Sequence, residues 1–318
     1  MAQIDELRLM ARVARMYYEQ EMRQAEIAQQ LGISQATVSR LFSRAKEEGI
    51  VRISVNVPQG VYSELEEGLI AAYSLRDAIV VDCPQEEEGA IQRQIGAAAA
   101  YYVESTIKPN EVIGLSSWSG TLLALVDAMH AVGRKNNVQV VQILGGVGNP
   151  GAELHATRLT SRFAKLVNGT AVFLPAPGVV GSAAMLQVML DDQYVQQALR
   201  LFDQVTLALV GIGAVEPSGL LADSGNIFTK AELNLLRNEG AVGDILLRFF
   251  DARGEPVQTA LDNRVVAMTL PQLRQVDRAV GVAGGRRKQE AILGALRGRW
   301  VNVLITDCFT AQWLLAAA

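Results

Sequence analysis

Five short segments rich in glycine and hydroxyl residues follow apolar runs of the sequence, and their residue types suit anion binding. They are GLSSWSGT (114–121), LGGVGNPG (144–151), PAPG (175–178), GIGAV (211–215) and AGGRRK (283–288). Glycine lets backbone N–H groups approach an anion, hydroxyls donate to it, and a following helix directs its positive end inward. Each segment alone also fits an ordinary turn between a strand and a helix, but the five together favour a pocket for a small anion.

Basic residues near these segments could complete such a pocket. Lys288 follows a glycine pair at the expected start of a helix, where its ammonium could meet a phosphate. Arg286 and Arg287 fit a solvated surface equally well. The candidate effector-binding residues are Ser116, Ser117, Ser119, Gly120, Thr121, Gly145, Gly146, Gly211, Gly213, Asp244 and Lys288.

Two carboxylates lie at expected strand ends. The segment GDILLRFFDARGEPV predicts two strands joined at Arg253–Gly254, with Asp244 at a strand entry. There it could accept hydrogen bonds from sugar hydroxyls. Asp307 follows the apolar run VLIT, and it either contributes to the pocket or caps the helix that begins near Phe309.

The elements that must position these residues are typical of a parallel sheet. From Ala78 onward, helical segments alternate with the apolar runs AIVVD (78–82), EVIGL (111–115), VQVVQIL (138–144), TAVFLP (170–175), QVTLALVGIG (204–213), RAVGVA (278–283) and VNVLITD (301–307). Nearly continuous apolar strands separated by helices predict a doubly wound parallel sheet, an α/β fold with helices on both faces. Ligands bind beyond the carboxyl ends of such strands, which is where the glycine-rich segments fall.

The segment QAEIAQQLGISQATVSRLFSRAKEEG (24–49) indicates two short helices that meet at a glycine. Gly32 can adopt the positive φ of a tight turn, Ser34 is a good amino-terminal cap, and Val38 faces the first helix. This pattern predicts a helix-turn-helix whose second helix enters the major groove of DNA. KEEGIVRISV (46–55) predicts the strand that follows as a wing.

Short polar and cationic side chains cover the outward face of the second helix. We expect Gln35, Thr37 and Ser39 to contact bases or nearby phosphates, and Arg40, Arg44 and Lys46 to contact mainly phosphates. Positive charge is concentrated there, because 34–46 holds three basic residues and no carboxylate although the chain has a net charge of −4. The alternative is a helical hairpin that only packs against another surface. The leading helix, expected over 4–20, could support this unit or pair subunits.

Length and composition indicate two domains. A chain of 318 residues that is 50% hydrophobic and 19% charged can bury a full-sized core. Pro58 and Gly60 interrupt the pattern before an amphipathic helix that begins near Val61. We therefore divide the chain into a DNA-binding domain, 1–57, and an effector-binding and oligomerisation domain, 58–318. A single DNA-binding unit offers a small interface, so we expect a dimer or tetramer.

Several classes of protein are excluded by the sequence pattern. The apolar runs fall short of the roughly 18–20 residues that cross a bilayer, and the amino terminus lacks the features of a signal peptide. We therefore expect a cytoplasmic protein that does not contact a membrane. Cys83 and Cys308 lack metal-ligand spacing and fit two buried small side chains, and His130 and His155 form no metal-binding motif. No cofactor or metal is predicted.

These features together resemble the SorC family of bacterial transcriptional regulators, sometimes grouped with the deoxyribonucleoside regulator. The resemblance spans essentially the whole chain and rests on QAEIAQQLGISQATVSRL, GLSSWSGT, LPAPG, GDI…FFDARG and VAGGRRKQEAILGALRGRWVNVLITD. It implies a carboxyl-terminal domain similar to the sugar-phosphate isomerase and glucosamine-6-phosphate deaminase fold, reused as an effector sensor in dimers and tetramers. It also implies phosphate contacts from Ser116, Ser119, Gly120 and Thr121, with Lys288 beside them and Asp244 as a carboxylate that binds hydroxyls.

We therefore expect a DNA-binding transcriptional regulator of a carbohydrate-utilisation operon. Its expected partners are double-stranded operator DNA, a phosphorylated sugar or polyol effector, and further copies of the chain. The alternative is a sugar-phosphate isomerase, deaminase or lactonase that carries a DNA-binding module, with Asp244, Asp307 or Glu153 as its base. The glycine-rich segments hold no dedicated base, which favours a sensor over an enzyme. A protein-interaction scaffold would leave those segments without a purpose.

Overall fold

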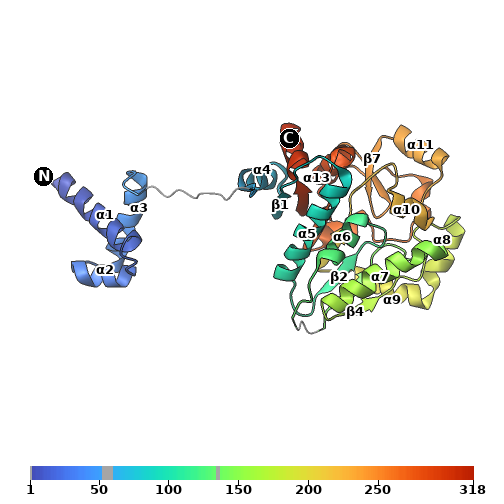
Figure 1. Ribbon diagram of the computed structural model, residues 1–318, viewed down its shortest axis with the longest axis horizontal. Helices are drawn as coiled ribbons and strands as arrows, with labels where there is room; N and C mark the ends of the chain where they lie inside the picture. The colour runs from blue at the N-terminus through green and yellow to red at the C-terminus, as the bar shows by residue number, and fades with distance from the viewer. Residues whose placement is uncertain (1, 52–59, 134–136) are drawn as a thin grey trace. The chain divides into compact units, whose positions relative to one another are not determined.

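The computed structural model describes residues 2–51, 60–133 and 137–318, and the chain divides into two compact units (Figure 1). The first unit is Met1–Pro58, and the second, Gln59–Ala318, is called the body below. Among the described helices, none combines the length and the apolar character that a bilayer crossing demands.

The amino-terminal unit contains the helix-turn-helix that the sequence predicts. Its helices are α1 (Ala2–Tyr18), α2 (Gln24–Leu31) and α3 (Gln35–Glu47). Gly32 ends α2 with a φ of 63°, and the Ser34 hydroxyl caps α3 by accepting from the Thr37 N–H at 3.1 Å. Met10 and Val13 of α1 are fully buried against α2 and α3, so α1 supports this unit. The expected wing extends past α3 into 52–55, outside the described residues.

Seven parallel strands form the main sheet of the body, as the apolar runs predict. They are β1 (Asp77–Val81), β2 (Val112–Leu115), β3 (Gln139–Gln142), β4 (Thr170–Val172), β5 (Leu207–Val210), β9 (Arg278–Val282) and β10 (Val303–Asp307). Their order is β1-β10-β9-β5-β2-β3-β4, and every pairing is parallel. Successive side chains of a strand point to opposite faces, so Ile79 and Val80 of β1 join two different hydrophobic clusters.

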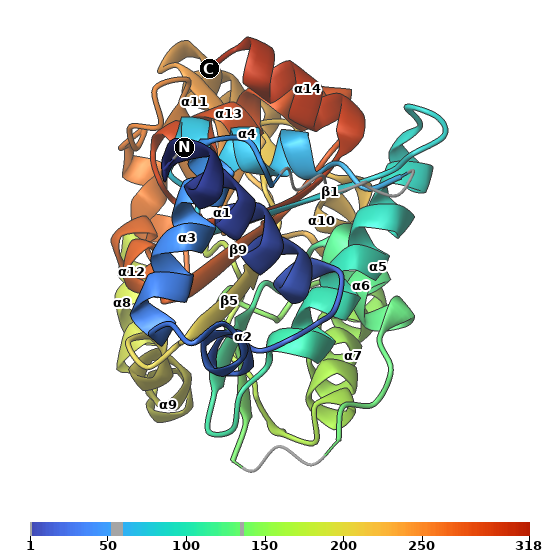
Figure 2. The same ribbon diagram turned by 90° about the vertical axis from the view of Figure 1, so that its left-hand side faces the viewer.

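Helices cover both faces of this sheet, which confirms the doubly wound α/β fold. The body's helices are α4 (Ser63–Tyr73), α5 (Glu88–Thr106), α6 (Gly120–Ala128), α7 (Pro150–Leu166), α8 (Ala183–Asp191), α9 (Gln193–Phe202), α10 (Gly219–Ser224), α11 (Lys230–Asn238), α12 (Leu270–Gln275), α13 (Gln289–Arg297) and α14 (Cys308–Ala316), with 3-10 turns η1 (Ala260–Arg264) and η2 (Arg286–Lys288). Buried residues of α5 and α6 and most of those of α7 join the cluster on one face, and those of α4, α9, α12 and α14 join the other. Figure 2 shows α5, α6 and α7 gathered on one side of the body.

A small antiparallel sheet corrects the expected position of one hairpin. It consists of β6 (Gly213–Ala214), β7 (Ala241–Ile245) and β8 (Arg248–Asp251). Leu246 and Leu247 join β7 to β8 with φ of 58° and 61°, whereas the expected junction at Arg253–Gly254 follows β8. Asp244 therefore lies near the end of a strand rather than at its entry. Two leucines carry no turn signal in the sequence, which is why the prediction failed.

Contacts around the leucine pair hold it in this unfavourable conformation. Left-handed backbone geometry costs a non-glycine residue about 1–3 kcal/mol. Both leucines are only 4% exposed, and the Leu247 N–H donates to the Asp244 carboxylate at 3.0 Å. Burial of the two leucine side chains and the hydrogen bond to the Asp244 carboxylate each stabilise the fold by a few kcal/mol or less, which is enough together to offset this strain.

A buried ion pair joins the amino-terminal ends of two strands in the main sheet. Arg278, the first residue of β9, donates to Glu111, the residue before β2, and to the Thr106 hydroxyl at 2.8 Å. The Glu111 carboxylate also accepts from the Lys108 N–H at 2.9 Å. Both side chains of the ion pair are at most 5% exposed, so loss of either partner leaves an uncompensated buried charge.

We predict that Glu111→Ala lowers the free energy of unfolding of the body by about 3–5 kcal/mol, because the Arg278 charge stays buried without its partner. Urea unfolding followed by tryptophan fluorescence measures this change, since Trp118, Trp300 and Trp313 all lie in the body. The matched control is Asp277→Ala, which removes an ion pair with Arg76 whose side chains are about half exposed. That control should cost under about 1 kcal/mol. Equal losses in the two variants would contradict the prediction.

Candidate functional site

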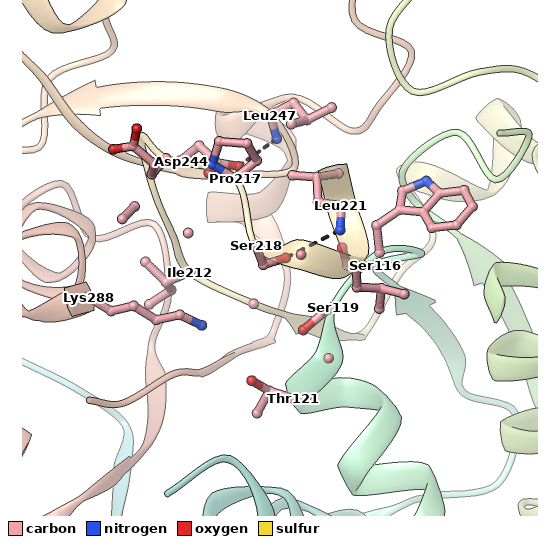
Figure 3. A pocket seen from close by; sticks show the side chains of 18 of the residues that line it. Ser116, Ser119, Thr121, Ile212, Pro217, Ser218, Leu221, Asp244, Leu247 and Lys288 are labelled. Atoms are coloured by element: carbon pink, nitrogen blue, oxygen red, sulfur yellow. Dashed lines mark hydrogen bonds between the residues drawn. The ribbon is translucent and has the colours of Figure 1, made fainter. Parts of the chain in front are cut away.

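A cavity of about 430 Å³ lies at the carboxyl ends of the strands in the main sheet (Figure 3). Its walls come from the segments that follow β2, β5 and β9, together with the first turns of α5. Strands β2 and β5 are neighbours in the sheet, yet the chain continues from β2 to β3 on one side and from β5 toward β9 on the other. Such a switch point is where open α/β sheets bind ligands.

The structure brings most of the predicted effector-binding residues together here. Eight of the eleven line the cavity, and they are Ser116, Ser119, Gly120, Thr121, Gly211, Gly213, Asp244 and Lys288. Six of them follow the ends of β2, β5 and β9 in the main sheet, whereas Gly213 and Asp244 belong to the small antiparallel sheet. The glycine-rich segments therefore predict the position of the cavity well.

The other three predicted residues do not line the cavity, and their polar groups bond within the protein. The Ser117 hydroxyl donates to the Leu144 carbonyl at 2.7 Å. The N–H of Gly145 donates to Val266 at 2.9 Å, and the N–H of Gly146 donates to Leu174 at 3.3 Å. A Cβ on Gly145 would lie 2.4 Å from the backbone of the PAPG segment, so this glycine permits close packing of two loops.

The first turn of α6 presents backbone donors to the cavity. Ser119 caps this helix, because its hydroxyl accepts from the Leu122 N–H at 3.3 Å. The N–H groups of Gly120 and Thr121 belong to the first turn and have no acceptor within the helix. Together with the helix dipole they favour an anion at this point.

Lys288 supplies the charge that faces this turn. It lies at the junction of η2 and α13, and its ammonium points toward Ser119 and Thr121 (Figure 3). Burial lowers the pKa of Lys288 below its usual value, and the nearby Arg287 lowers it further, whereas Glu88 and Asp244 act in the opposite direction. An anion bound beside the ammonium would raise this pKa again, because it favours the charged form.

Asp244 lies across the cavity from the first turn of α6 (Figure 3). Its side chain is held at the back of the hairpin by the Leu247 N–H, and the residue is 9% exposed. Burial raises the pKa of Asp244 from 3.8 to about 6, while the Leu247 N–H and Lys288 oppose that rise. Gly213 permits this placement, because a Cβ there would lie 2.3 Å from a carboxylate oxygen of Asp244.

Several lining residues were missed by the sequence analysis. The apolar part of the wall includes Trp118, Leu144, Ile212, Pro217, Leu221, Leu246 and Leu247, and the polar part includes Glu88, Gln92 and Ser218. Arg287, for which the sequence left a pocket and a solvated surface open, also lines the cavity. Glu88 and Gln92 follow β1 at the start of α5, so the same strand-end rule applied to the first strand would have found them. The hairpin leucines carry no such signal, because their position depends on the unexpected turn.

The three carboxylates considered as catalytic bases are Asp244, Asp307 and Glu153. Asp307 is fully buried and caps α14, where it accepts from the N–H groups of Thr310 at 2.9 Å and Gly285 at 2.8 Å. This resolves its two alternatives in favour of a helix cap. Asp244 lines the cavity and Asp307 does not, while the side chain of Glu153 lies outside the described residues. His130 is exposed next to Glu104.

The two cysteines are buried thiols, as the sequence predicts. Burial raises the pKa of Cys83 to about 11, and the nearby acidic groups of Asp307, Cys308 and Asp82 raise it as well. Within the part of the chain that the structure describes, no group of three or more His, Cys, Asp or Glu side chains is placed to hold a metal ion.

The outward face of α3 is polar and accessible. Gln35, Ser39, Arg40 and Lys46 are exposed on it, and helical spacing places these positions along one side of the helix. Thr37 is partly buried, and its hydroxyl shares a 2.9 Å hydrogen bond with Ser34. The face therefore presents amide, hydroxyl and cationic groups of the kind that contact base edges and phosphates.

Within the described part of the chain, Arg44 forms ion pairs in the amino-terminal unit, unlike Arg40 and Lys46 on the same helix. It forms an ion pair with Glu6 of α1 and lies 3.9 Å from Glu48. Two carboxylates thus compete with phosphate for its guanidinium. Among the residues that the structure describes, Arg40 has no carboxylate partner and makes a 3.4 Å contact with the Thr37 hydroxyl.

We predict that the stability of the body depends on the protonation of Asp244. Because its pKa is raised to about 6 in the folded state, the folded protein binds this proton more tightly than the unfolded chain does. The free energy of unfolding should therefore fall as pH rises from about 4 to about 6, by about 1.4 kcal/mol for each unit of pKa difference. Urea unfolding of wild type and Asp244→Asn across this range measures the effect.

The difference in free energy of unfolding between wild type and Asp244→Asn reports the titration of Asp244 alone, because the other titratable groups are the same in both proteins. Relative to Asp244→Asn, the wild type should lose stability through this window and then remain level above it. Asp223→Asn, on the exposed end of α10, is the matched control and should run parallel to wild type. A constant difference between wild type and Asp244→Asn from pH 4 to pH 7 would contradict the prediction.

Family models match both units of the chain. The model described as "Putative sugar-binding domain" matches residues 58–316, which is most of the chain and nearly all of the body. The model described as "Sigma-70, region 4" matches residues 13–48, which contain the helix-turn-helix.

Known proteins resemble the chain along nearly its whole length. The deoxyribonucleoside regulator of Bacillus subtilis is 35% identical over 302 residues, with 95% of each chain covered. The sorbitol operon regulator of Klebsiella pneumoniae is 31% identical over 315 residues, with 98% of each covered. The crystal structure of the full-length sorbitol operon regulator SorC from Klebsiella pneumoniae superposes with a TM-score of 0.74, covering 97% of this chain and 98% of that one.

These relatives are named as transcriptional regulators, which supports a regulator over the enzyme alternative. The match extends through the helix-turn-helix and the body together, so it includes both the DNA-binding unit and the cavity. The chain belongs to the SorC family of transcriptional regulators, with an amino-terminal helix-turn-helix and a carboxyl-terminal sugar-binding domain.

Proposed function

We propose that this protein regulates a carbohydrate-utilisation operon in the cytoplasm and that a phosphorylated sugar or polyol in the cavity controls its binding to operator DNA. One observation carries the proposal. The ammonium of Lys288 faces the first turn of α6 inside the cavity, so a cation and free backbone donors converge on one point. A phosphate is the sugar substituent that such a site binds best.

The opposite end of the cavity suits the remainder of a sugar. Asp244 offers a carboxylate that can accept from a hydroxyl, while Ile212, Leu246 and Leu247 offer apolar surface for the C–H faces of the ligand. The distribution of polar groups thus gives a ligand one orientation, with its phosphate at α6 and a hydroxyl at Asp244. The names of the relatives fit this class, since one is a deoxyribonucleoside regulator and the other a sorbitol operon regulator.

Control of DNA binding requires that the ligand distinguish two states of the protein. The sequence that follows the amino-terminal unit enters α4, which packs against strand β1 of the main sheet and against helix α14. We propose that the protein is a dimer or tetramer and that effector binding favours one arrangement of its subunits, which changes the spacing of the DNA-binding units. A ligand shifts such an equilibrium only by its difference in affinity for the two arrangements, typically about 1–3 kcal/mol.

We predict that Arg40→Ala weakens operator binding and lowers its salt dependence, because a lost phosphate contact releases about one counterion fewer. Fluorescence anisotropy with operator DNA at several salt concentrations measures both quantities. Arg44→Ala is the matched comparison, since Glu6 already neutralises this residue. It should change the salt slope by less than Arg40→Ala does. An unchanged slope for Arg40→Ala would remove this residue from the phosphate contacts.

We predict that sugar or polyol phosphates raise the melting temperature of the full-length protein and that Lys288→Ala abolishes this shift while operator binding without effector persists. Ligand that binds only the folded state stabilises it by mass action, so a thermal-shift panel of phosphorylated and unphosphorylated compounds measures the effect. Lys230→Ala, at the exposed start of α11, is the matched control and should respond as wild type does. Shifts with unphosphorylated compounds alone would overturn the proposed phosphate site.

A further inference from the structure

Among the described residues that line the cavity, a single cation is outside an ion pair. Those that line it are Glu88, Glu216, Asp244, Arg287 and Lys288. Arg287 is paired with Glu88 at 2.9 Å and donates to the backbone carbonyl of Glu216 at 3.3 Å. The Glu216 carboxylate pairs in turn with Arg237 outside the cavity at 2.5 Å. Lys288 is then the cation that remains to neutralise a bound anion.

This charge distribution limits the ligand to one phosphate. A phosphate at the first turn of α6 meets Lys288 and the helix dipole. A second phosphate elsewhere in the cavity would face the carboxylates of Glu88 or Asp244, and like charges brought together out of bulk water repel strongly. The remainder of the ligand is therefore neutral.

The crossing of α5 over α6 places a further donor at the phosphate end. A Cβ on Gly96 of α5 would lie 2.7 Å from the Cβ of Ala124, so the two helices approach to near backbone contact. Gln92 lies one turn before Gly96 in α5, and Gly120 lies one turn before Ala124 in α6. The amide nitrogen of Gln92 is 2.6 Å from the position that a Cβ on Gly120 would take. Gln92 also lines the cavity. Its side-chain amide is thus positioned over the first turn of α6, where the phosphate would bind.

We infer that the cavity selects a monophosphorylated, otherwise neutral ligand, that Gln92 is a phosphate-binding residue, and that Glu88 keeps a second phosphate out by holding Arg287. This inference rests on the proposed function and adds the number of phosphates and two specificity-determining residues. Glu88 and Gln92 are one helical turn apart on α5, so a single helix face decides both how tightly the first phosphate is bound and whether a second one is admitted.

The first test compares Gln92→Leu with Gln94→Leu in the full-length protein. Gln94 is exposed on the same helix, so the two variants share one chemical change. Isothermal titration with inorganic phosphate and with the sugar monophosphates that stabilise wild type measures the affinity. Loss of a hydrogen bond to a charged group predicts at least about tenfold weaker binding for Gln92→Leu and wild-type binding for Gln94→Leu. Wild-type affinity in Gln92→Leu would overturn the assignment of this residue.

The second test compares matched pairs of mono- and bisphosphates of the same sugar, such as fructose 6-phosphate with fructose 1,6-bisphosphate and glucose 6-phosphate with glucose 1,6-bisphosphate. Wild type should bind the monophosphate at least about tenfold more tightly than its bisphosphate, because the second phosphate meets carboxylates. Glu88→Gln frees Arg287 and should remove most of this preference. Glu86→Gln, exposed just before α5, removes the same charge outside the cavity and should retain the preference.

The outcomes separate failure of this inference from failure of the proposed function. Bisphosphates that bind wild type as tightly as monophosphates would overturn the single-phosphate inference and leave the phosphate site standing. An unchanged preference in Glu88→Gln would overturn the role of Glu88 alone. Binding of neutral sugars without binding of any phosphorylated compound would overturn the proposed function, and this inference with it.

Discussion

The parallel pairing of β2 with β5 is the constraint on which the cavity depends. Leu115 lies opposite Leu209 in the register of these strands, and the pairing continues one residue further through the Ser116 N–H, which donates to Leu209 at 3.2 Å. The chain then turns away in opposite directions, which brings Gly211 against Ser119, where a Cβ would lie 2.9 Å from the hydroxyl. The start of α6 is thus fixed by buried backbone hydrogen bonds, so its donors are held in place before a ligand arrives.

The opposite wall of the cavity is held in a different way. The hairpin between β7 and β8 turns at two leucines in the left-handed conformation, and Asp244 secures the second of them through its backbone N–H. Asp244 in turn needs Gly213 beside it, because a side chain there would displace the carboxylate. A hydroxyl that binds Asp244 therefore contacts the group that stabilises a strained turn. Backbone strain of this kind gathers at functional sites.

The fold and the position of the cavity follow from local sequence patterns, whereas the shape of the cavity does not. Seven apolar runs separated by helices predict the seven parallel strands, and glycine-rich segments after β2, β5 and β9 predict where a ligand would bind. Gly145 and Gly146 match the same pattern, but Gly145 permits the packing of two loops and Gly146 packs against the Gln142 side chain, a difference that only tertiary contacts reveal. The turn at Leu246 was missed because tertiary burial imposes it against local preference. Gln92 lines the cavity from the start of α5, and it was missed because the strand-end rule was not applied to β1.

The operator affinity of the full-length protein with and without a saturating sugar phosphate tests the central claim most directly, because that claim is a coupling between the cavity and the DNA-binding unit. The account predicts that a ligand held at Lys288 and the first turn of α6 changes operator affinity by roughly 5–150-fold, and that operator DNA changes the affinity for that ligand by the same factor. A sugar phosphate that binds the cavity while leaving operator affinity unchanged would contradict it.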